Sequence, residues 1–83
     1  MEITVLYFAS YKDKSGINKE YLLLELTNEY TISDILEIIL TNHPNISTPK
    51  DKIVVAINEE YQTHEYKIND GDIIALIPPV SGG

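Results

Sequence analysis

The chain contains no cysteine, no tryptophan and no arginine among its 83 residues. The absence of cysteine excludes disulfides, thiolate metal ligands and a cysteine nucleophile or persulfide. The absence of arginine leaves six lysines against 13 acidic residues, a formal net charge of −7. Nucleic acid is therefore not an expected partner, because phosphate backbones attract basic surfaces. A basic protein surface is the expected partner, bound in a salt-sensitive way.

Length and hydrophobicity predict a small single domain. With 83 residues and 43% hydrophobic content, the chain suits one core, and we expect a domain over residues 1–79 with a projecting, flexible tail over 80–83. A catalytic cleft is hard to build at this size, so any chemistry is expected to depend on a partner. No long apolar segment or basic leader is present, so we expect a cytoplasmic protein with no membrane partner.

The hydrophobic pattern predicts five strands and one helix. Apolar residues recur at helical spacing within "YTISDILEIILTNHP", residues 30–44, where Thr31 and Asp34 have the spacing of a capping box and Asn42-His43-Pro44 ends the helix. Residues 10–17 are expected to form a loop, and Asp70-Gly71 a turn. The expected strands are 2–9, 19–26, 52–58, 66–68 and 72–78.

This order of elements predicts an α+β fold. One main helix packed across a mixed sheet of four to five strands buries both apolar surfaces, with the first and last strands as its parallel central pair. The arrangement is a β-grasp, or ubiquitin-like, fold.

The chain ends on "IPPVSGG", residues 77–83. Proline lacks the amide hydrogen that a sheet needs, so the last strand is expected to end at Pro78 and Pro79. Gly82 and Gly83 have no Cβ atoms, which makes the tail slim enough for a narrow channel. The pattern favours a C-terminal carboxylate presented for chemistry, although a frayed end is the other reading. A carboxylate needs activation, and a separate ATP-using enzyme is expected because the chain has no Gly-rich phosphate loop.

The sequence resembles the small, sulfur-carrier subunits of molybdopterin synthase. The likeness is strongest over "VAINEEY" at 55–61 and "INDGDIIALIPPVSGG" at 68–83, and "LYFASYKDKSG" at 6–16 is similar to the usual start of the family. The chain departs from the family at Lys12, where arginine is frequent, and at Ile73, where an acidic residue is frequent.

The resemblance implies that Gly83 is the reacting residue. In the family, an adenylating enzyme of the ubiquitin-activating type uses ATP with magnesium to activate the terminal glycine, and a sulfur donor acting through that enzyme converts it to a thiocarboxylate. The tail then enters the active site of the large subunit and gives sulfur to cyclic pyranopterin monophosphate, two carriers binding one large-subunit dimer. No cofactor is expected on this chain itself. The residues expected to be recognised in the tail are Pro78, Pro79, Val80, Ser81 and Gly82.

Other side chains are weaker candidates for a site. We expect an aromatic docking surface formed by Phe8, Tyr11 and Tyr61, with Glu60 contacting a basic partner. His43 and His64 are expected to be solvent-exposed and without function, since each lacks a second ligand at useful spacing. No metal site is expected.

Some alternative functions would also use the terminal carboxyl group, and one would not. A carrier for thiazole synthesis or transfer-RNA thiolation, or a ubiquitin-like modifier attached to lysines, would use the same glycines. A plain β-grasp binding module would not use them, so deletion of Gly83 separates it from a carrier.

Overall fold

The computed structural model describes residues 1–78. Its element order agrees with the predicted α+β fold and adds a short helix near the N-terminus. The elements are β1 (Glu2–Tyr7), α1 (Ala9–Ser15), β2 (Lys19–Leu23), α2 (Ile32–Asn42), the 3₁₀ helix η1 (Lys50–Lys52), β3 (Val54–Ile57), β4 (Glu60–Gln62) and β5 (Ile73–Ile77).

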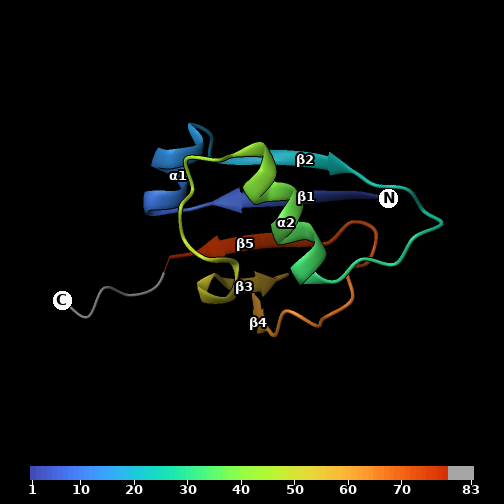
Figure 1. Cartoon of the computed structure of the whole chain (residues 1–83). Coiled ribbons are helices and arrows are strands. Elements are labelled where there is room, and N and C mark those ends of the chain that lie inside the picture. Colours follow the sequence, from blue (N-terminus) through green and yellow to red (C-terminus); the bar gives the residue numbers. More distant parts are fainter. Residues whose placement is uncertain (79–83) are drawn as a thin grey trace.

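The five strands form one mixed sheet in the order β2-β1-β5-β3-β4. β1 and β5 run parallel at its centre, and the other neighbouring pairs are antiparallel. Helix α2 lies across one face of this sheet, as Figure 1 shows. The predicted β-grasp fold, with its parallel central pair, is confirmed.

Helix α2 has the boundaries that its sequence predicts. The Thr31 hydroxyl accepts a hydrogen bond from the amide of Asp34, and an Asp34 carboxylate oxygen accepts one from the amide of Thr31, 3.0 Å away. This capping box satisfies amide groups that the first turn leaves without helical partners. The helix ends at Asn42, two residues before Pro44.

The core lies between α2 and the sheet. Alternate residues of each central strand point toward the helix, as the twofold period of a strand requires. The strands contribute Ile3, Val5 and Tyr7 from β1 and Ile74 and Leu76 from β5, and α2 contributes Ile32, Ile35, Leu36 and Ile39. Each of these side chains is at most 1% exposed, so this interface is the main source of hydrophobic stabilisation.

Residues 9–15 form helix α1, where the sequence predicted a loop. Tyr11, on this helix, is only 1% exposed and belongs to the core, so its predicted role in a docking surface is wrong. Gly16 ends the helix in the left-handed conformation, with φ of 80°, and its amide donates to the Lys12 carbonyl. A helix this short is not stable alone, so α1 depends on the burial of Tyr11 in the core. The polar composition of the segment does not reveal that contact.

Three of the predicted strand assignments also differ in detail from the structure. β2 ends at Leu23 rather than residue 26. The strand expected at 66–68 is reduced to an isolated bridge between Thr31 and Lys67. Instead, Asn58 and Glu59 take positive φ angles of 49° and 76° and turn the chain into β4, as in a two-residue hairpin. Within residues 1–78, no helix is long and apolar enough to cross a membrane.

Candidate functional site

The predicted reactive tail begins where β5 ends. β5 finishes at Ile77, directly before Pro78, as the proline pair predicts. Pro78 itself is partly buried. The other tail residues singled out in the sequence lie outside the described residues; they are Pro79, Val80, Ser81, Gly82 and Gly83. The boundary expected between domain and tail, at 79/80, lies there too.

Strand register places two other segments beside Pro78. Leu76 pairs with Tyr7, the last residue of β1, and α1 begins two residues later. Ile77 pairs with Val54, the first residue of β3, and η1 lies immediately before that strand. The carboxyl end of β5 is therefore flanked by α1 on one side and η1 on the other, and Figure 1 shows the three at the same end of the molecule.

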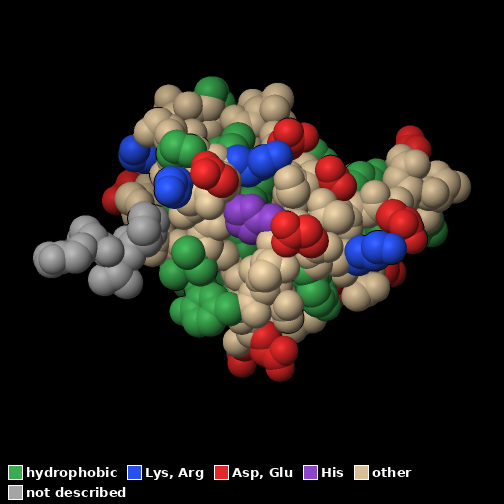
Figure 2. Space-filling model, turned by 60° about the horizontal axis from the view of Figure 1, so that its bottom comes forward, with side chains coloured by type: hydrophobic (Ala, Val, Ile, Leu, Met, Phe, Trp, Pro, Cys, Tyr) green, Lys and Arg blue, Asp and Glu red, His purple; other side chains and the backbone are tan. Residues whose placement is uncertain are grey.

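The sheet face opposite α2 carries many apolar side chains, several of them exposed. We call it the open face. Pairing across the strands sets Leu6 beside Ala75, Ala75 beside Ala56, and Ala56 beside Tyr61 on this face. Its exposed large hydrophobic side chains are Phe8, Tyr21, Leu23, Val54, Tyr61 and Ile73. Figure 2, with the β4 edge of the sheet turned forward, shows hydrophobic side chains, in green, at the surface toward the lower left of that view.

A groove of about 420 Å³ crosses the open face. Phe8 forms one wall and the turn residues Asn58 and Glu59 form another, and apolar side chains line the rest: Leu6, Ile73 and Ala75. Contiguous exposed apolar surface on a small protein marks a site of interaction with another molecule. The groove is therefore a candidate contact surface, and Phe8, which follows β1, brings it toward the end of the sheet where β5 finishes.

Three of the four predicted docking residues are accessible, but they do not share one face. Phe8 is 46% exposed and Tyr61 72% exposed, and both lie on the open face. Glu60 is exposed but pairs with Ile57, whose side chain is buried beneath α2, so Glu60 lies on the other side of the sheet from Tyr61. Phe8 and Tyr61 remain predicted docking residues.

A hydrogen-bonded network anchors the rim of the groove. Asp72, 6% exposed, accepts hydrogen bonds from the Asn69 amide at 2.8 Å and from the Asn58 side chain at 3.1 Å. The Asn58 side-chain oxygen in turn accepts from the Ile73 amide at 3.0 Å. Asp70-Gly71 forms the predicted turn, with Gly71 at φ of 85°. The "NDGD" segment and Asn58 therefore hold the β3–β4 turn against the start of β5.

The two histidines are not the exposed side chains that the sequence suggested. His43 is half-buried beside Tyr7 and lies 3.1 Å from Glu20, so it joins the end of α2 to β2. A ring nitrogen of His64 lies 2.8 Å from the Ile53 carbonyl oxygen. Both side chains have structural roles, because each makes a polar contact with another segment of the fold. Among residues 1–78, no cluster of three or more acidic or histidine side chains could hold a metal.

The sequence profile of the ThiS family matches residues 5–83 of the chain. The molybdopterin synthase sulfur carrier subunit of Chlamydomonas reinhardtii is 38% identical, and the alignment covers 100% of each chain. Among solved structures, SAMP1 from Haloferax volcanii has a TM-score of 0.83 at 25% identity, with 100% of each chain covered. A complex of subunits 1 and 2 of the molybdopterin-converting factor from Helicobacter pylori contains a chain with TM-score 0.67 at 20% identity, again covering 100% of each chain.

Proposed function

The chain belongs to the ThiS family, and from this membership we infer that it is the sulfur carrier subunit of a molybdopterin synthase. The observation that carries this conclusion is the 38% identity to the Chlamydomonas reinhardtii sulfur carrier along the whole of both chains. The fold supports it, since the whole chain matches the structure of SAMP1 from Haloferax volcanii with a TM-score of 0.83.

We propose that sulfur is carried on the carboxyl group of Gly83. In the first step a carboxylate oxygen attacks the α-phosphorus of ATP on the adenylating enzyme, and pyrophosphate leaves. In the second step a hydrosulfide ion, delivered by a sulfur donor through that enzyme, attacks the acyl carbon, and AMP leaves with the electron pair of the broken carbon–oxygen bond. The product is a C-terminal thiocarboxylate. This route fits a chain that has no cysteine to hold sulfur elsewhere.

The catalytic pocket belongs, in this proposal, to the large subunit. The carrier supplies the sulfur-bearing group, and the large subunit binds cyclic pyranopterin monophosphate and accepts the tail of residues 79–83. The solved complex of subunits 1 and 2 from Helicobacter pylori supports such an assembly. The open face, with Phe8 and Tyr61, is the proposed contact surface because apolar, aromatic patches form the centres of protein interfaces. Cytoplasmic location and a heterotetramer stay predictions.

The test is the intact mass of the chain after incubation with the adenylating enzyme, ATP, magnesium and a sulfur donor. Exchange of one oxygen for sulfur, located by fragmentation at Gly83, is the expected result. Sulfur transfer to cyclic pyranopterin monophosphate then requires only the purified large subunit. A variant that lacks Gly83 should fold normally and acquire no sulfur. Sulfur transfer by that deletion variant would overturn the mechanism.

A second function is favoured by one observation, the likeness to SAMP1 of Haloferax volcanii, since relatives of that fold include a small archaeal modifier protein. Attachment of Gly83 to lysine amino groups would need the same acyl-adenylate, attacked by nitrogen instead of sulfur. Tryptic peptides that carry a branched remnant of the tail would reveal it. A carrier dedicated to molybdopterin should yield no such peptides, and carriers for thiazole or transfer-RNA thiolation would be separated by their acceptors.

A further inference from the structure

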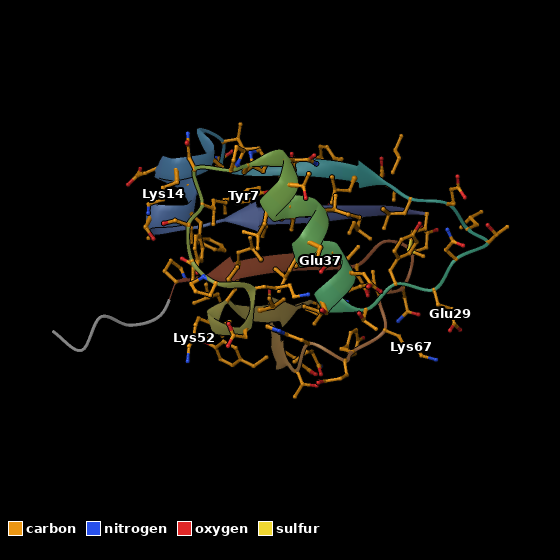
Figure 3. The ribbon with its side chains drawn as sticks, in the orientation of Figure 1. Tyr7, Lys14, Glu29, Glu37, Lys52 and Lys67 are labelled. Atoms are coloured by element: carbon orange, nitrogen blue, oxygen red, sulfur yellow. The ribbon has the colours of Figure 1, made fainter. Side chains whose placement is uncertain are left out.

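Positive charge is concentrated at the end of the molecule where β5 finishes. Figure 3 shows Lys14 and Lys52 at that end, whereas Glu29 and Lys67 lie at the opposite end. The chain has six lysines in all. Five of them belong to segments at this end or to the strand start beside it: Lys12 and Lys14 on α1, Lys19 at the start of β2, and Lys50 and Lys52 in η1.

Register explains this concentration. Because Tyr7 pairs with Leu76 and Val54 pairs with Ile77, both α1 and η1 are held next to Pro78. Lys19 pairs with Leu6 near the end of β1, at the same end of the sheet. Segments that are about 40 residues apart in the sequence are thus brought together around the root of the tail.

Four of these lysines carry charge that their surroundings do not neutralise. Lys50 lies 3.0 Å from Glu37 and is paired. The other four are exposed and form no ion pair within residues 1–78. We call them the basic end: Lys12, Lys14, Lys19 and Lys52. The acidic residues on the same segments are Asp13 on α1, Asp51 in η1 and Glu20 on β2, and the Glu20 carboxylate is bound by Tyr7 and His43.

The remainder of the molecule is acidic. Carboxylates at the opposite end are opposed by a single lysine, Lys67, which lies 3.5 Å from Glu29; they include Glu2, Glu25, Glu29, Asp34 and Asp70. Figure 2 shows red acidic side chains predominating over the right of that view. The net charge is −7, but one end of the molecule is rich in lysine and the opposite end is rich in carboxylates.

The reach of the tail decides which end meets the partner. A stretch of five residues can span at most about 17 Å, so an active site that takes Gly83 lies within that distance of Pro78. The partner must then contact the surface around the end of β5. This step rests on the proposed function, in which Gly83 is the residue presented.

We propose that the basic end docks against carboxylates of the large subunit, arranged around the entrance to the cleft that receives residues 79–83. Opposite charges at the contact speed encounter, and the acidic remainder of the carrier is repelled by the same carboxylates. The carrier is thereby oriented with its tail toward the cleft. The expectation drawn from net charge alone, a basic partner surface, is reversed for this contact.

The test compares substitutions that change net charge equally at the two ends. Lys14→Glu, Lys52→Glu and Lys67→Glu each change the charge by two units at an exposed position. Association with the purified large subunit is measured by stopped flow at about 50 mM and about 500 mM salt, which differ strongly in screening. At low salt, Lys14→Glu and Lys52→Glu should each slow association about threefold and the double variant about tenfold, whereas Lys67→Glu changes it by less than about 1.5-fold.

High salt should remove most of these differences. Equal effects at the two ends, or faster association of Lys14→Glu and Lys52→Glu, would overturn the proposal. Lys14→Gln and Lys52→Gln, with half the charge change, should show about half the effect on the logarithm of the rate. They keep the comparison available if a charge reversal disturbs folding.

A separate measurement distinguishes this proposal from the proposed function. Wild-type carrier bearing the thiocarboxylate is mixed with saturating large subunit, and the sulfur transferred is counted by mass. Normal binding with the expected charge dependence but no transfer would refute the sulfur carrier role alone. Normal transfer with no dependence on Lys14 or Lys52 would refute the charge proposal alone. Absence of any binding by the wild-type carrier would refute both.

Discussion

The hydroxyl group of Tyr7 donates a hydrogen bond of 2.5 Å to the carboxylate of Glu20. The ring of His43, at the end of α2, meets Tyr7 edge-on and also lies 3.1 Å from that carboxylate. Three elements, β1, β2 and the end of α2, are therefore joined at one partly buried polar cluster. Polar contacts of this kind fix which way the helix end is seated on the sheet.

Tyr7→Phe removes the hydroxyl group that donates the hydrogen bond to Glu20. It should lower the free energy of unfolding by about 1–2 kcal/mol at pH 7, because Glu20 loses a hydrogen bond at a partly buried site. Burial, with a smaller contribution from Glu20, raises the pKa of Tyr7 above its usual value. The unfolded chain therefore ionises first, and the stabilisation is complete below about pH 10 and lost above it.

Urea unfolding of both proteins between about pH 7 and pH 11.5 checks this. The difference between wild type and Tyr7→Phe should stay constant up to about pH 9.5 and shrink at higher pH. Tyr61→Phe, at a tyrosine 72% exposed, is the matched control and should change little at any pH. A difference that stays constant to pH 11.5 would contradict the assignment.

Asp72→Ala should be the most damaging substitution in the loop before β5. It removes an acceptor from the Asn69 amide and from the side chain of Asn58, which lines the groove. Unpaired polar groups at such a site cost about 1–3 kcal/mol, measured as a lower urea midpoint. Asp13→Ala, at an exposed position on α1, should change the midpoint by less than about 0.5 kcal/mol. Equal effects of the two would show that the network does not support the fold.

The sequence was sufficient to predict α2 and the central strand pair because their signals are local and strong. Thr31, Asp34 and Pro44 mark the helix ends by backbone chemistry that needs no tertiary context. Helix α1 could not be predicted, since its stability depends on burying Tyr11 against strands. The β4 hairpin was missed because Glu59, unlike glycine or asparagine, gives no sign of a positive φ angle.

The candidate site was only partly predictable for a related reason. The glycines of the tail form a local pattern that is visible in the sequence. The open face can be recognised only when the pairing of the strands is known. Phe8 and Tyr61 share a face because β5 and β3 lie between β1 and β4 in the sheet. Glu60 falls on the opposite side by the same geometry. The basic end likewise gathers lysines from three segments, α1, β2 and η1, which the sheet brings together, so it cannot be recognised from the net charge of the whole chain.

Thr31→Ala tests the capping box of α2. Loss of the hydroxyl leaves the Asp34 amide without its acceptor, and the expected loss of stability is about 1 kcal/mol. Thr31→Ser keeps the oxygen and should stay within about 0.5 kcal/mol of wild type. Thermal unfolding followed by circular dichroism is a suitable measurement. A Thr31→Ser variant as unstable as Thr31→Ala would mean that the methyl group, and not the hydrogen bond, is responsible.

Phe8→Ala and Tyr61→Ala test the open face as the surface that meets the large subunit. Each removes an exposed aromatic ring and should weaken binding at least tenfold, since buried aromatic side chains dominate interfaces. Leu26→Ala is the control: Leu26 is 75% exposed but lies in the loop after β2, away from the groove. Calorimetric titration against the large subunit gives the affinities. Comparable losses for all three variants would argue that no particular face is used.

A series at Gly82 tests whether the tail enters a narrow channel. Gly82→Ala, Gly82→Val and Gly82→Leu add increasing bulk beside the reacting carboxyl group while leaving the strands unchanged. If the channel admits only bare backbone, sulfur transfer should fall progressively, by about tenfold for alanine and by more than about 100-fold for leucine. Single-turnover transfer from the thiocarboxylate form isolates this step from adenylation. Urea midpoints should stay at the wild-type value, which separates a blocked channel from a damaged fold, and a leucine variant that transfers sulfur normally would show that the partner accepts a wider tail.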